Sequence, residues 1–437
     1  MTAGWRTFLI VWSGQLVSLL GTAMTRFALL IWAYQQTGAA TPVALLGFFS
    51  FAPFVLIGPL AGAVVDRIDR RIVMIVADLG AGLSTLAILA LLTTGHLAVW
   101  HLFAAEFFAG ACEAFQGPAY SAATTLLVTP QDYSRVNGLR SLADAAARVA
   151  APALAGLVLV GIGLYGVLFV DVATFLVAVG TLLTVRFPAP PPEIGDEERH
   201  LRADLVFGVR FLAQRPGLIG LLIVFMGINL FGTLTYMAIL PAMVLARTGG
   251  DELGWAAVQV ALGTGSLVGA LIASVWRGPA RRVHLIYGGA ALSFLMGDFL
   301  LAVGRTVPVW TVAAFVASIF IPLVMAGDRA IWQTKVPPAY QGRVFSTTNM
   351  LRMATMPVGY LLAGPLADRV FEPAMAAGGA LAPLFGPLVG VGPGAGMALM
   401  FLCTWALGTL TSLSGYAWRA ARRVEVDLPD QPAPAVS

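Results

Sequence analysis

Long hydrophobic segments alternate with short charged segments along this 437-residue chain. A helix needs about 20 mostly apolar residues to cross the hydrocarbon core of a bilayer. Twelve segments meet that requirement, at residues 8–34, 42–65, 72–93, 97–120, 136–160, 164–186, 218–246, 253–276, 284–303, 307–325, 345–367 and 394–418. The pattern therefore predicts an all-α membrane protein with twelve transmembrane helices.

The basic residues are distributed as membrane topology requires. If both termini are cytoplasmic, the inside segments hold 20 of the 26 Lys and Arg residues, and outside loops hold three. This asymmetry is the positive-inside pattern. We therefore predict a multi-pass protein of the cell membrane with both termini in the cytoplasm. Because the positive charge follows topology, the pI of 9.3 gives no reason to expect a nucleic-acid partner.

Composition indicates that the lipid bilayer is the main surrounding of the chain. It is 58% hydrophobic and 11% charged, with a mean hydropathy of +0.84, whereas soluble domains carry about 25% charged residues. Two cysteines, Cys112 and Cys403, are too few for a disulfide framework or a zinc site. The sequence has neither a Walker-type phosphate loop nor a Ser-His-Asp constellation. We therefore expect no enzyme, cofactor or metal.

A proline-rich, charged segment at residues 187–217 divides the chain, and its second part has the helical spacing of an amphipathic helix on the membrane surface. The predicted domains are a six-helix bundle at 1–186, this cytoplasmic linker, a second six-helix bundle at 218–418 and a cytoplasmic tail at 419–437. VTPQDYSRV from Val128 and VPPAYQGRV from Val336 repeat Val, Pro, Arg and Val at an offset of 208. Parallel repeats of this kind place a binding site between the halves, near the midplane.

The stretch GPLAGAVVDRIDRR, Gly58–Arg71, lies between the second and third predicted helices. It resembles the signature loop of the major facilitator superfamily through Gly62, Asp66, Arg67, Arg70 and Arg71. The DRxDRR version, SLLGTAMTRFALLIWAYQQTG and QGRVFSTTNMLRMATMPVGYLLAGPLADRVFEP are similar to the drug- and siderophore-exporter branch, which includes macrolide-efflux and enterobactin-exporter-like proteins. The resemblance implies two pseudo-symmetric six-helix bundles, a monomer, and a cytoplasmic gate at this loop.

The same resemblance implies roles for residues of the second and fifth predicted helices. In the family's arrangement, Asp66 caps the eleventh helix, and glycines such as Gly58 and Gly62 allow close helix approach. The fifth helix keeps Pro152 and Gly156 of the family's hinge motif but has Ala151 before the proline.

Nine ionisable residues lie within the predicted spans, and facing lipid would be costly for them. Arg26 and Glu106 lie at similar depth, so we predict that they pair. Glu113 lies two turns beyond Glu106 with no obvious partner in its own half, which makes it our first candidate for proton coupling, with Glu106 and Asp144 as further candidates. Asp144 and Arg148 have the i,i+4 spacing of a helical ion pair. We expect structural pairing for three aspartates on supporting helices: Asp78, with Arg71 or a neighbour, Asp171 and Asp298.

Arg352 is predicted to reach Asp66 and complete the gate. Apolar and aromatic residues such as Phe27 would surround the substrate, with Arg26, Gln116, Asn229 and Tyr236 as polar contacts.

The sequence predicts a secondary transporter that exports hydrophobic or amphiphilic small molecules, such as drugs or natural products, in exchange for protons. Three alternatives remain: uptake, movement of a lipid-like substrate, and a non-transporting membrane sensor or assembly factor.

Overall fold

The computed structural model describes residues 3–185, 187, 201–276 and 278–430, and these residues form helices and no β-strand. The first half contains α1 (Ala3–Thr37), α2 (Ala40–Arg67), α3 (Arg70–Thr93), α4 (Val99–Leu127), η1 (Pro130–Asp132), α5 (Tyr133–Ile162) and α6 (Leu164–Thr184). The second half contains α7 (Leu201–Ala213), α8 (Pro216–Gly232), η2 (Thr233–Ile239), α9 (Leu240–Thr248), α10 (Glu252–Val275), α11 (Val283–Leu292), η3 (Ser293–Asp298), α12 (Phe299–Val303), α13 (Val307–Lys335), η4 (Pro338–Tyr340), α14 (Gln341–Met353), α15 (Thr355–Leu366), η5 (Ala367–Phe371), α16 (Glu372–Met375), α17 (Ala382–Val389), α18 (Ala395–Ala417), α19 (Arg419–Arg422) and α20 (Val424–Asp427).

Each of the twelve predicted spans coincides with a helix or a run of consecutive helices. Ten helical stretches in the described residues are long and apolar enough to cross a membrane. The other two are α4, which has 29 residues and carries Glu106 and Glu113, and the run 341–375, which is divided by the π-helical segment η5. The twelve-helix prediction is consistent with this arrangement.

Several helices extend beyond the predicted boundaries, and the largest difference is at the tenth span. The tenth predicted span ends at residue 325, whereas α13 continues to Lys335. The sequence suggested a loop because Asp328, Arg329 and Lys335 are charged. Asp328 and Lys335 are nevertheless buried in the helix, because each has a partner of opposite charge.

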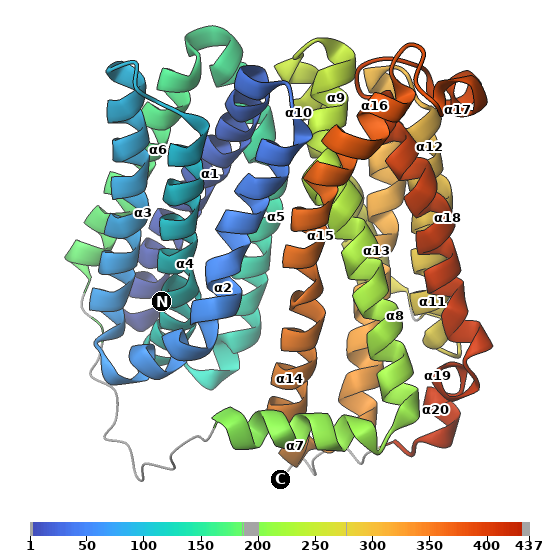
Figure 1. Cartoon of the computed structure of the whole chain (residues 1–437). Coiled ribbons are helices and arrows are strands. Elements are labelled where there is room, and N and C mark those ends of the chain that lie inside the picture. The colour runs from blue at the N-terminus through green and yellow to red at the C-terminus, as the bar shows by residue number, and fades with distance from the viewer. Residues whose placement is uncertain (1–2, 186, 188–200, 277, 431–437) are drawn as a thin grey trace. The chain divides into compact units, whose positions relative to one another are not determined.

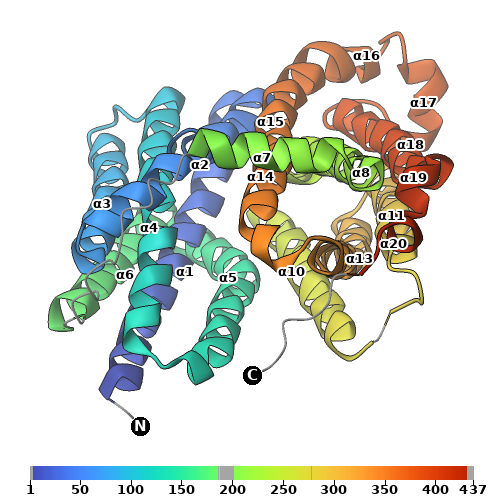
Figure 2. The ribbon, with the colours of Figure 1, turned by 90° about the horizontal axis from the view of Figure 1, so that it is seen from below.

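The chain divides into two compact units, Met1–Ile194 with Val244–Val260, and Gly195–Met243 with Ala261–Ser437. In the first unit, α1 packs on α5 and α6, and α4 packs on α2 and α3. Figure 2 shows these helices from below. Gly110 of α4 lies against the backbone of Ser50 in α2, where a Cβ would collide with the Ser50 carbonyl. That glycine therefore sets how closely α2 and α4 approach.

The turn between α2 and α3 is held by its own charged residues. Asp69 is the N-cap of α3, and its carboxylate accepts a hydrogen bond from the backbone N–H of Arg71 at 2.8 Å. The Arg71 guanidinium donates to the carbonyls of Leu182 and Leu183, at 2.8 and 2.9 Å, in the last turn of α6. Arg71 thus satisfies two orphan carbonyls of a helix end. The expectation that it pairs with a carboxylate such as Asp78 is wrong.

In the second unit, the predicted amphipathic helix is α7, which Figure 1 shows running across the ends of α8 and α14. Phe207 and Phe211 of α7 pack against Tyr340, and Gly208 lies against Thr347. Three π-helical segments, η2, η3 and η5, interrupt helices of this unit. Such segments widen a helix locally and are often found at functional sites.

Candidate functional site

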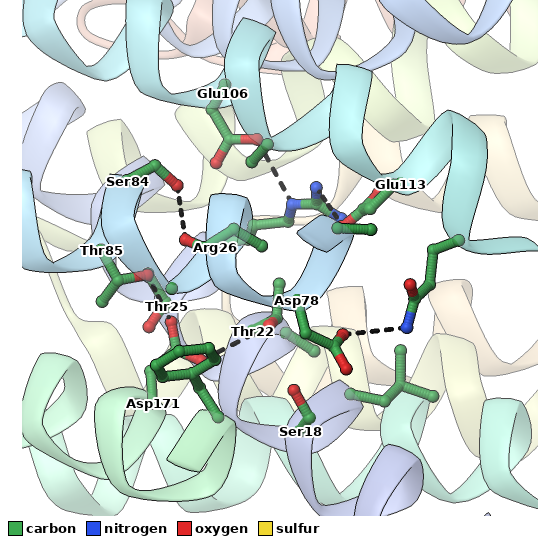
Figure 3. Close-up of a pocket in the computed structure, with 18 of the residues that line it drawn as sticks. Ser18, Thr22, Thr25, Arg26, Asp78, Ser84, Thr85, Glu106, Glu113 and Asp171 are labelled. Carbon is green, nitrogen blue, oxygen red and sulfur yellow. Dashed lines mark hydrogen bonds and ion pairs between the residues drawn. The ribbon is translucent and has the colours of Figure 1, made fainter. Parts of the chain in front are cut away.

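A cavity of about 370 Å³ lies within the first unit, between α1, α3, α4 and α6. Five charged side chains line it: Arg26, Asp78, Glu106, Glu113 and Asp171. Figure 3 shows them facing one another around the cavity, together with several Ser and Thr hydroxyls. Four of the five are acidic, so the cavity carries an excess of negative charge when every group is ionised.

Arg26 of α1 joins two carboxylates of α4. Its Nε lies 3.3 Å from Glu106 Oε2, and its Nη2 lies 2.7 Å from Glu113 Oε1. The predicted pairing of Arg26 with Glu106 is therefore confirmed, whereas the expectation that Glu113 lacks a partner in its own half is wrong. A guanidinium has five N–H donors in a planar fork, and this allows it to serve both carboxylates.

The two glutamates differ in their access to solvent. The Glu106 side chain is 10% exposed, whereas the Glu113 side chain is 38% exposed. Glu113 is thus the member of the cluster that water or a ligand reaches more easily.

Asp78 of α3 is buried and accepts hydrogen bonds from two amides. Gln15 Nε2 donates to Oδ2 and Gln116 Nε2 donates to Oδ1, both at 2.9 Å. Gln116, which the sequence assigned to the substrate cavity, also donates to Gln15 Oε1 at 2.9 Å. Its own Oε1 is buried and has no hydrogen-bond partner within the described part of the chain. These three side chains extend the polar network from the Arg26 cluster along the cavity.

Asp171 of α6 closes the other side of the same cavity. Its Oδ2 accepts from Thr85 at 2.8 Å, and its Oδ1 accepts from Thr22 at 3.4 Å. Like Asp78, it is buried and contacts neutral donors rather than a cation. The carboxylates of α3 and α6 are thus hydrogen-bonded but not neutralised by an ion pair.

The second unit holds a different ion pair. Arg352 of α14 contacts both carboxylate oxygens of Asp328 in α13, with Nη1–Oδ2 at 2.6 Å and Nη2–Oδ1 at 2.9 Å. Its guanidinium lies over the rings of Phe225 and Trp332, and Trp332 Nε1 donates to Asp328 at 3.0 Å. The Arg352 guanidinium is thus held by Asp328 of its own unit, and its predicted reach toward Asp66 stays a prediction. The Asp66 side chain itself is outside the described part of the structure.

A second, mostly apolar cavity of about 200 Å³ lies in this unit, and Asn229 and Tyr236 line it as predicted for substrate contacts. Three Phe and three Met side chains are among the other thirteen lining residues, and Met side chains adapt to ligands of different shape. The Tyr236 hydroxyl donates to Asp298 Oδ1 at 2.6 Å, and the Thr404 hydroxyl donates to Oδ2 at 2.6 Å. Asp298 was expected to have a structural partner, and its partners in the structure are these two hydroxyl groups.

Two other predicted arrangements are not found in the described part of the first unit. Phe27 is buried and stacks on Trp255, with ring centroids 6.3 Å apart, so it does not line the cavity. Asp144 and Arg148 of α5 are exposed, and no ion pair joins them where the structure describes this helix.

The residues predicted for the gate and for the hinge of the fifth helix lie in different surroundings. Among the described residues, no heavy atom lies within 4 Å of a Cβ added at Gly58 or at Gly62. Their predicted close approach to the eleventh span, which belongs to the other unit, stays a prediction. Gly156 does lie at a close contact, because a Cβ added there would be 3.0 Å from the Ala256 methyl group. Pro152 lies inside α5, which is helical from Tyr133 to Ile162. Arg67 is exposed and Arg70 is partly buried beside the Asp69 turn.

The family model of the Major Facilitator Superfamily matches residues 11–360, which is most of the chain. The chain belongs to the major facilitator superfamily. It is therefore a multi-pass membrane transporter and not an enzyme.

Relatives of known function are similar over most of their length. Macrolide efflux protein A of Streptococcus pyogenes is 28% identical over 370 residues, covering 83% of this chain and 90% of that protein. Multidrug efflux pump Tap of Mycolicibacterium fortuitum is 26% identical over 349 residues, covering 76% and 82%.

The architecture agrees with solved structures of the superfamily. An inward-facing bacterial homologue of the human lysosomal transporter Spinster has a TM-score of 0.69 at 14% identity, with each chain covered completely. The nucleoside transporter NupG has a TM-score of 0.66 at 12% identity, with 96% of this chain and 100% of that chain covered. At these identities the likeness shows the fold alone.

Sequence reasoning missed two parts of the polar interior. Asp328 was placed in a loop, although Arg352 was recognised as a buried charge that needed a partner. Gln15 interrupts the first apolar segment. The interruption marked a polar position in the sequence, but it did not indicate that Gln15 contacts Asp78. Within the described residues, no group of three or more His, Cys, Asp or Glu side chains is arranged to hold a metal ion.

Proposed function

We propose that this transporter exports hydrophobic or amphiphilic small molecules, such as drugs or natural products, in exchange for protons. It does so by alternating access of its two six-helix bundles in the cell membrane, with both termini in the cytoplasm. The observation that carries the proposal is that one guanidinium, Arg26, is shared by two carboxylates, Glu106 and Glu113, at a cavity lined by five charged side chains.

The charge of this cluster supports proton coupling. When all three groups are ionised, the cluster has a net charge of −1, and Asp78 and Asp171 add further negative charge to the same cavity. An uncompensated charge within a membrane protein is costly unless it is neutralised or solvated. A proton on one glutamate neutralises the cluster while Arg26 remains paired with the other.

Glu113 is the glutamate that a proton from water reaches more easily, because its side chain is the more exposed. Protonation of Glu113 weakens its 2.7 Å contact with Arg26, whereas the contact of Arg26 with Glu106 remains. The link between α1 and α4 then differs between the two protonation states. A contact that forms in one state only can shift a conformational equilibrium.

The remaining parts of the cycle follow from the superfamily's arrangement and from the efflux function of the two relatives. We assign the cytoplasmic gate to Gly62, Asp66, Arg67, Arg70, Arg71 and Arg352, and the hinge to Pro152 and Gly156. Asp144 is a secondary candidate for coupling, since it lies outside the charged cavity. The second cavity, with Asn229 and Tyr236, would hold part of an apolar substrate.

The test is proton-driven transport by the purified protein in liposomes, with erythromycin and rhodamine 6G as probes. The wild type should move at least one probe against its gradient when a pH gradient is applied. Glu113→Gln should lose this uphill movement while retaining exchange of labelled for unlabelled probe. Glu252→Gln, the same change at a partly exposed glutamate that accepts a hydrogen bond from Gln35, is the matched control and should behave as the wild type.

Two results would contradict the proposal. If Glu113→Gln retains full proton coupling, Glu113 is not the coupling residue. If the folded wild type moves neither probe and no protons, the non-transporting sensor becomes the better explanation.

A further inference from the structure

A second membrane-buried carboxylate lies in the other unit, separate from the Arg26 cluster. Asp298 is at the end of η3 and is 0% exposed. Both of its oxygens accept short hydrogen bonds, from Tyr236 and from Thr404. Among the described residues, no Arg, Lys or His forms an ion pair with it.

Few ionisable groups are placed to affect Asp298. Tyr236, from η2, is the titratable side chain in contact with it. The helices packed on η3 are α11, α12, α13 and α18. Their ionisable residues are His284 and Tyr287 on α11, Asp328, Arg329 and Lys335 on α13, and Cys403 and Tyr416 on α18, and α12 has none.

These groups are distant or neutral. Tyr287 is eleven residues from Asp298 along the helix, about 16 Å at 1.5 Å per residue. Asp328 is equally far along α13 from Ala317, which lies beside Gly297. Cys403 is a thiol adjacent to Thr404. Arg305, in the loop after α12, donates instead to the carbonyl of Pro387. No cation therefore compensates the charge of Asp298 within the described part of this unit.

The hydrogen bonds around Asp298 can satisfy either ionisation state. When the carboxylate is ionised, it accepts from the Tyr236 and Thr404 hydroxyls. The Thr404 hydroxyl also has a second acceptor, the carbonyl of Phe401 at 3.1 Å. A hydroxyl has one proton and two lone pairs, so it can donate to one group while accepting from another.

We propose that Asp298 is a proton-binding site that is loaded and emptied without leaving any polar group unpaired. A proton from water adds to Oδ2, and the new O–H donates to Thr404 Oγ1. The Thr404 hydroxyl then turns its own proton to the Phe401 carbonyl. Tyr236 continues to donate to Oδ1, now to a neutral acceptor instead of a charged one, and such a bond is weaker.

The position of Tyr236 connects this site to the apolar cavity. Its hydroxyl contacts Asp298, and the residue also lines the 200 Å³ cavity together with Asn229. Tyr236 and Asp298 both belong to π-helical segments, which deviate from regular helix geometry at this contact. Protonation of Asp298 and occupation of the cavity therefore act on one side chain. The role of this link in transport rests on the proposed proton coupling, but protonation itself does not.

Infrared difference spectroscopy of the full-length protein in detergent tests the proposal without any substrate. The carbonyl-stretch band of protonated carboxyl groups is recorded as the buffer is changed from mildly acidic to mildly alkaline. The wild type should show a titrating band that Asp298→Asn lacks, with a loss equivalent to one carboxyl group per protein. Thr404→Ser should preserve the band and its midpoint, whereas Thr404→Val, which removes the hydroxyl used in both states, should change the midpoint.

The same spectra contain the outcomes that overturn the inference. If Asp298→Asn leaves the titrating bands unchanged, Asp298 is permanently ionised or permanently protonated. If Asp298→Asn does not fold, the Thr404 pair decides, and equal midpoints for Thr404→Val and the wild type refute the mechanism. A failure of Glu113→Gln to affect proton coupling would contradict the proposed function but leave this titration unaffected.

Discussion

Replacing Arg26 with methionine tests whether one guanidinium holds two carboxylates in the first unit. Methionine keeps an unbranched chain of similar length but removes every donor. Glu106, whose side chain is 10% exposed, then loses its counter-charge. Removing one partner of a buried ion pair costs about 3–5 kcal/mol. Since the Arg26 side chain is 35% exposed, we expect a loss near the lower value, about 3 kcal/mol.

The two glutamates should contribute unequally to that loss. The contact with Glu113 is solvent-accessible on both sides, with exposures of 35% and 38%, so its coupling with Arg26 should be at most about 1 kcal/mol. The coupling with Glu106 should be larger, about 1–3 kcal/mol. In the double variant Arg26→Met/Glu106→Gln, no buried charge loses its partner, so the double variant should be less destabilised than the sum of the two single variants.

The assay is unfolding in mixed detergent micelles, with a double-mutant cycle for each pair. Arg419→Gln removes an exposed arginine outside the bundles and is the control for the loss of a positive charge. If the Arg26 and Glu106 variants are additive within about 0.5 kcal/mol, the two groups are not energetically coupled and the reasoning is refuted. Equal coupling energies for Glu106 and Glu113 would refute the argument from exposure.

Three further predictions concern other described contacts. Asp328→Asn should destabilise the second unit by about 3–5 kcal/mol, and Asp328→Asn/Arg352→Met should cost less than the sum of the single variants, as measured by unfolding in detergent. Gly110→Ala should cost about 1–3 kcal/mol because its methyl group collides with a backbone carbonyl, whereas Gly138→Ala on α5, which has open space, should be neutral or stabilising in the same assay. A hydrogen bond from the Lys335 ammonium, together with its charge, lowers the pKa of Asp430. This contact should therefore stabilise the tail fully at pH values above the pKa of an ordinary aspartate, about 3.9, and the stabilisation should be lost as the pH falls through the lowered pKa. Hydrogen exchange of the tail should show this loss in the wild type and not in Asp430→Asn.

Hydropathy was sufficient to predict the number and order of the helices. Each span is long enough that a single charge does not conceal it, as Arg26 in α1 illustrates. The boundary of α13 was not predictable in the same way. Asp328 resembles a loop residue until Arg352, distant in sequence, is known to lie beside it. Helix ends that depend on tertiary partners are therefore the least accessible part of a membrane-protein sequence.

The contacts of the candidate site could likewise be predicted only in part from the sequence. Equal depth in the membrane was enough to predict the pair of Arg26 with Glu106, because depth follows from residue count at 1.5 Å per residue. The pair with Glu113 was missed since spacing along α4 places it two turns away, and the reach of an arginine side chain was not considered. Phe27 was assigned to a cavity from its helix alone. Which face of a helix is buried depends on neighbours such as Trp255.

The two units solve the problem of buried charge in different ways, although the sequence repeat relates them. In the first unit, one arginine faces four carboxylates within a single cavity. In the second unit, Arg352 is matched by Asp328 alone, and Asp298 is left with hydroxyl donors. Among the described residues, each unit therefore contains at least one carboxylate without a cation of its own. Because an unpaired charge in a bilayer must be solvated or neutralised, a proton is the simplest counter-charge that both units can accept. If protons neutralise the two units at different stages of the cycle, the Arg26 cluster and Asp298 would titrate independently, and Asp298→Asn would leave the coupling between Arg26 and Glu106 unchanged.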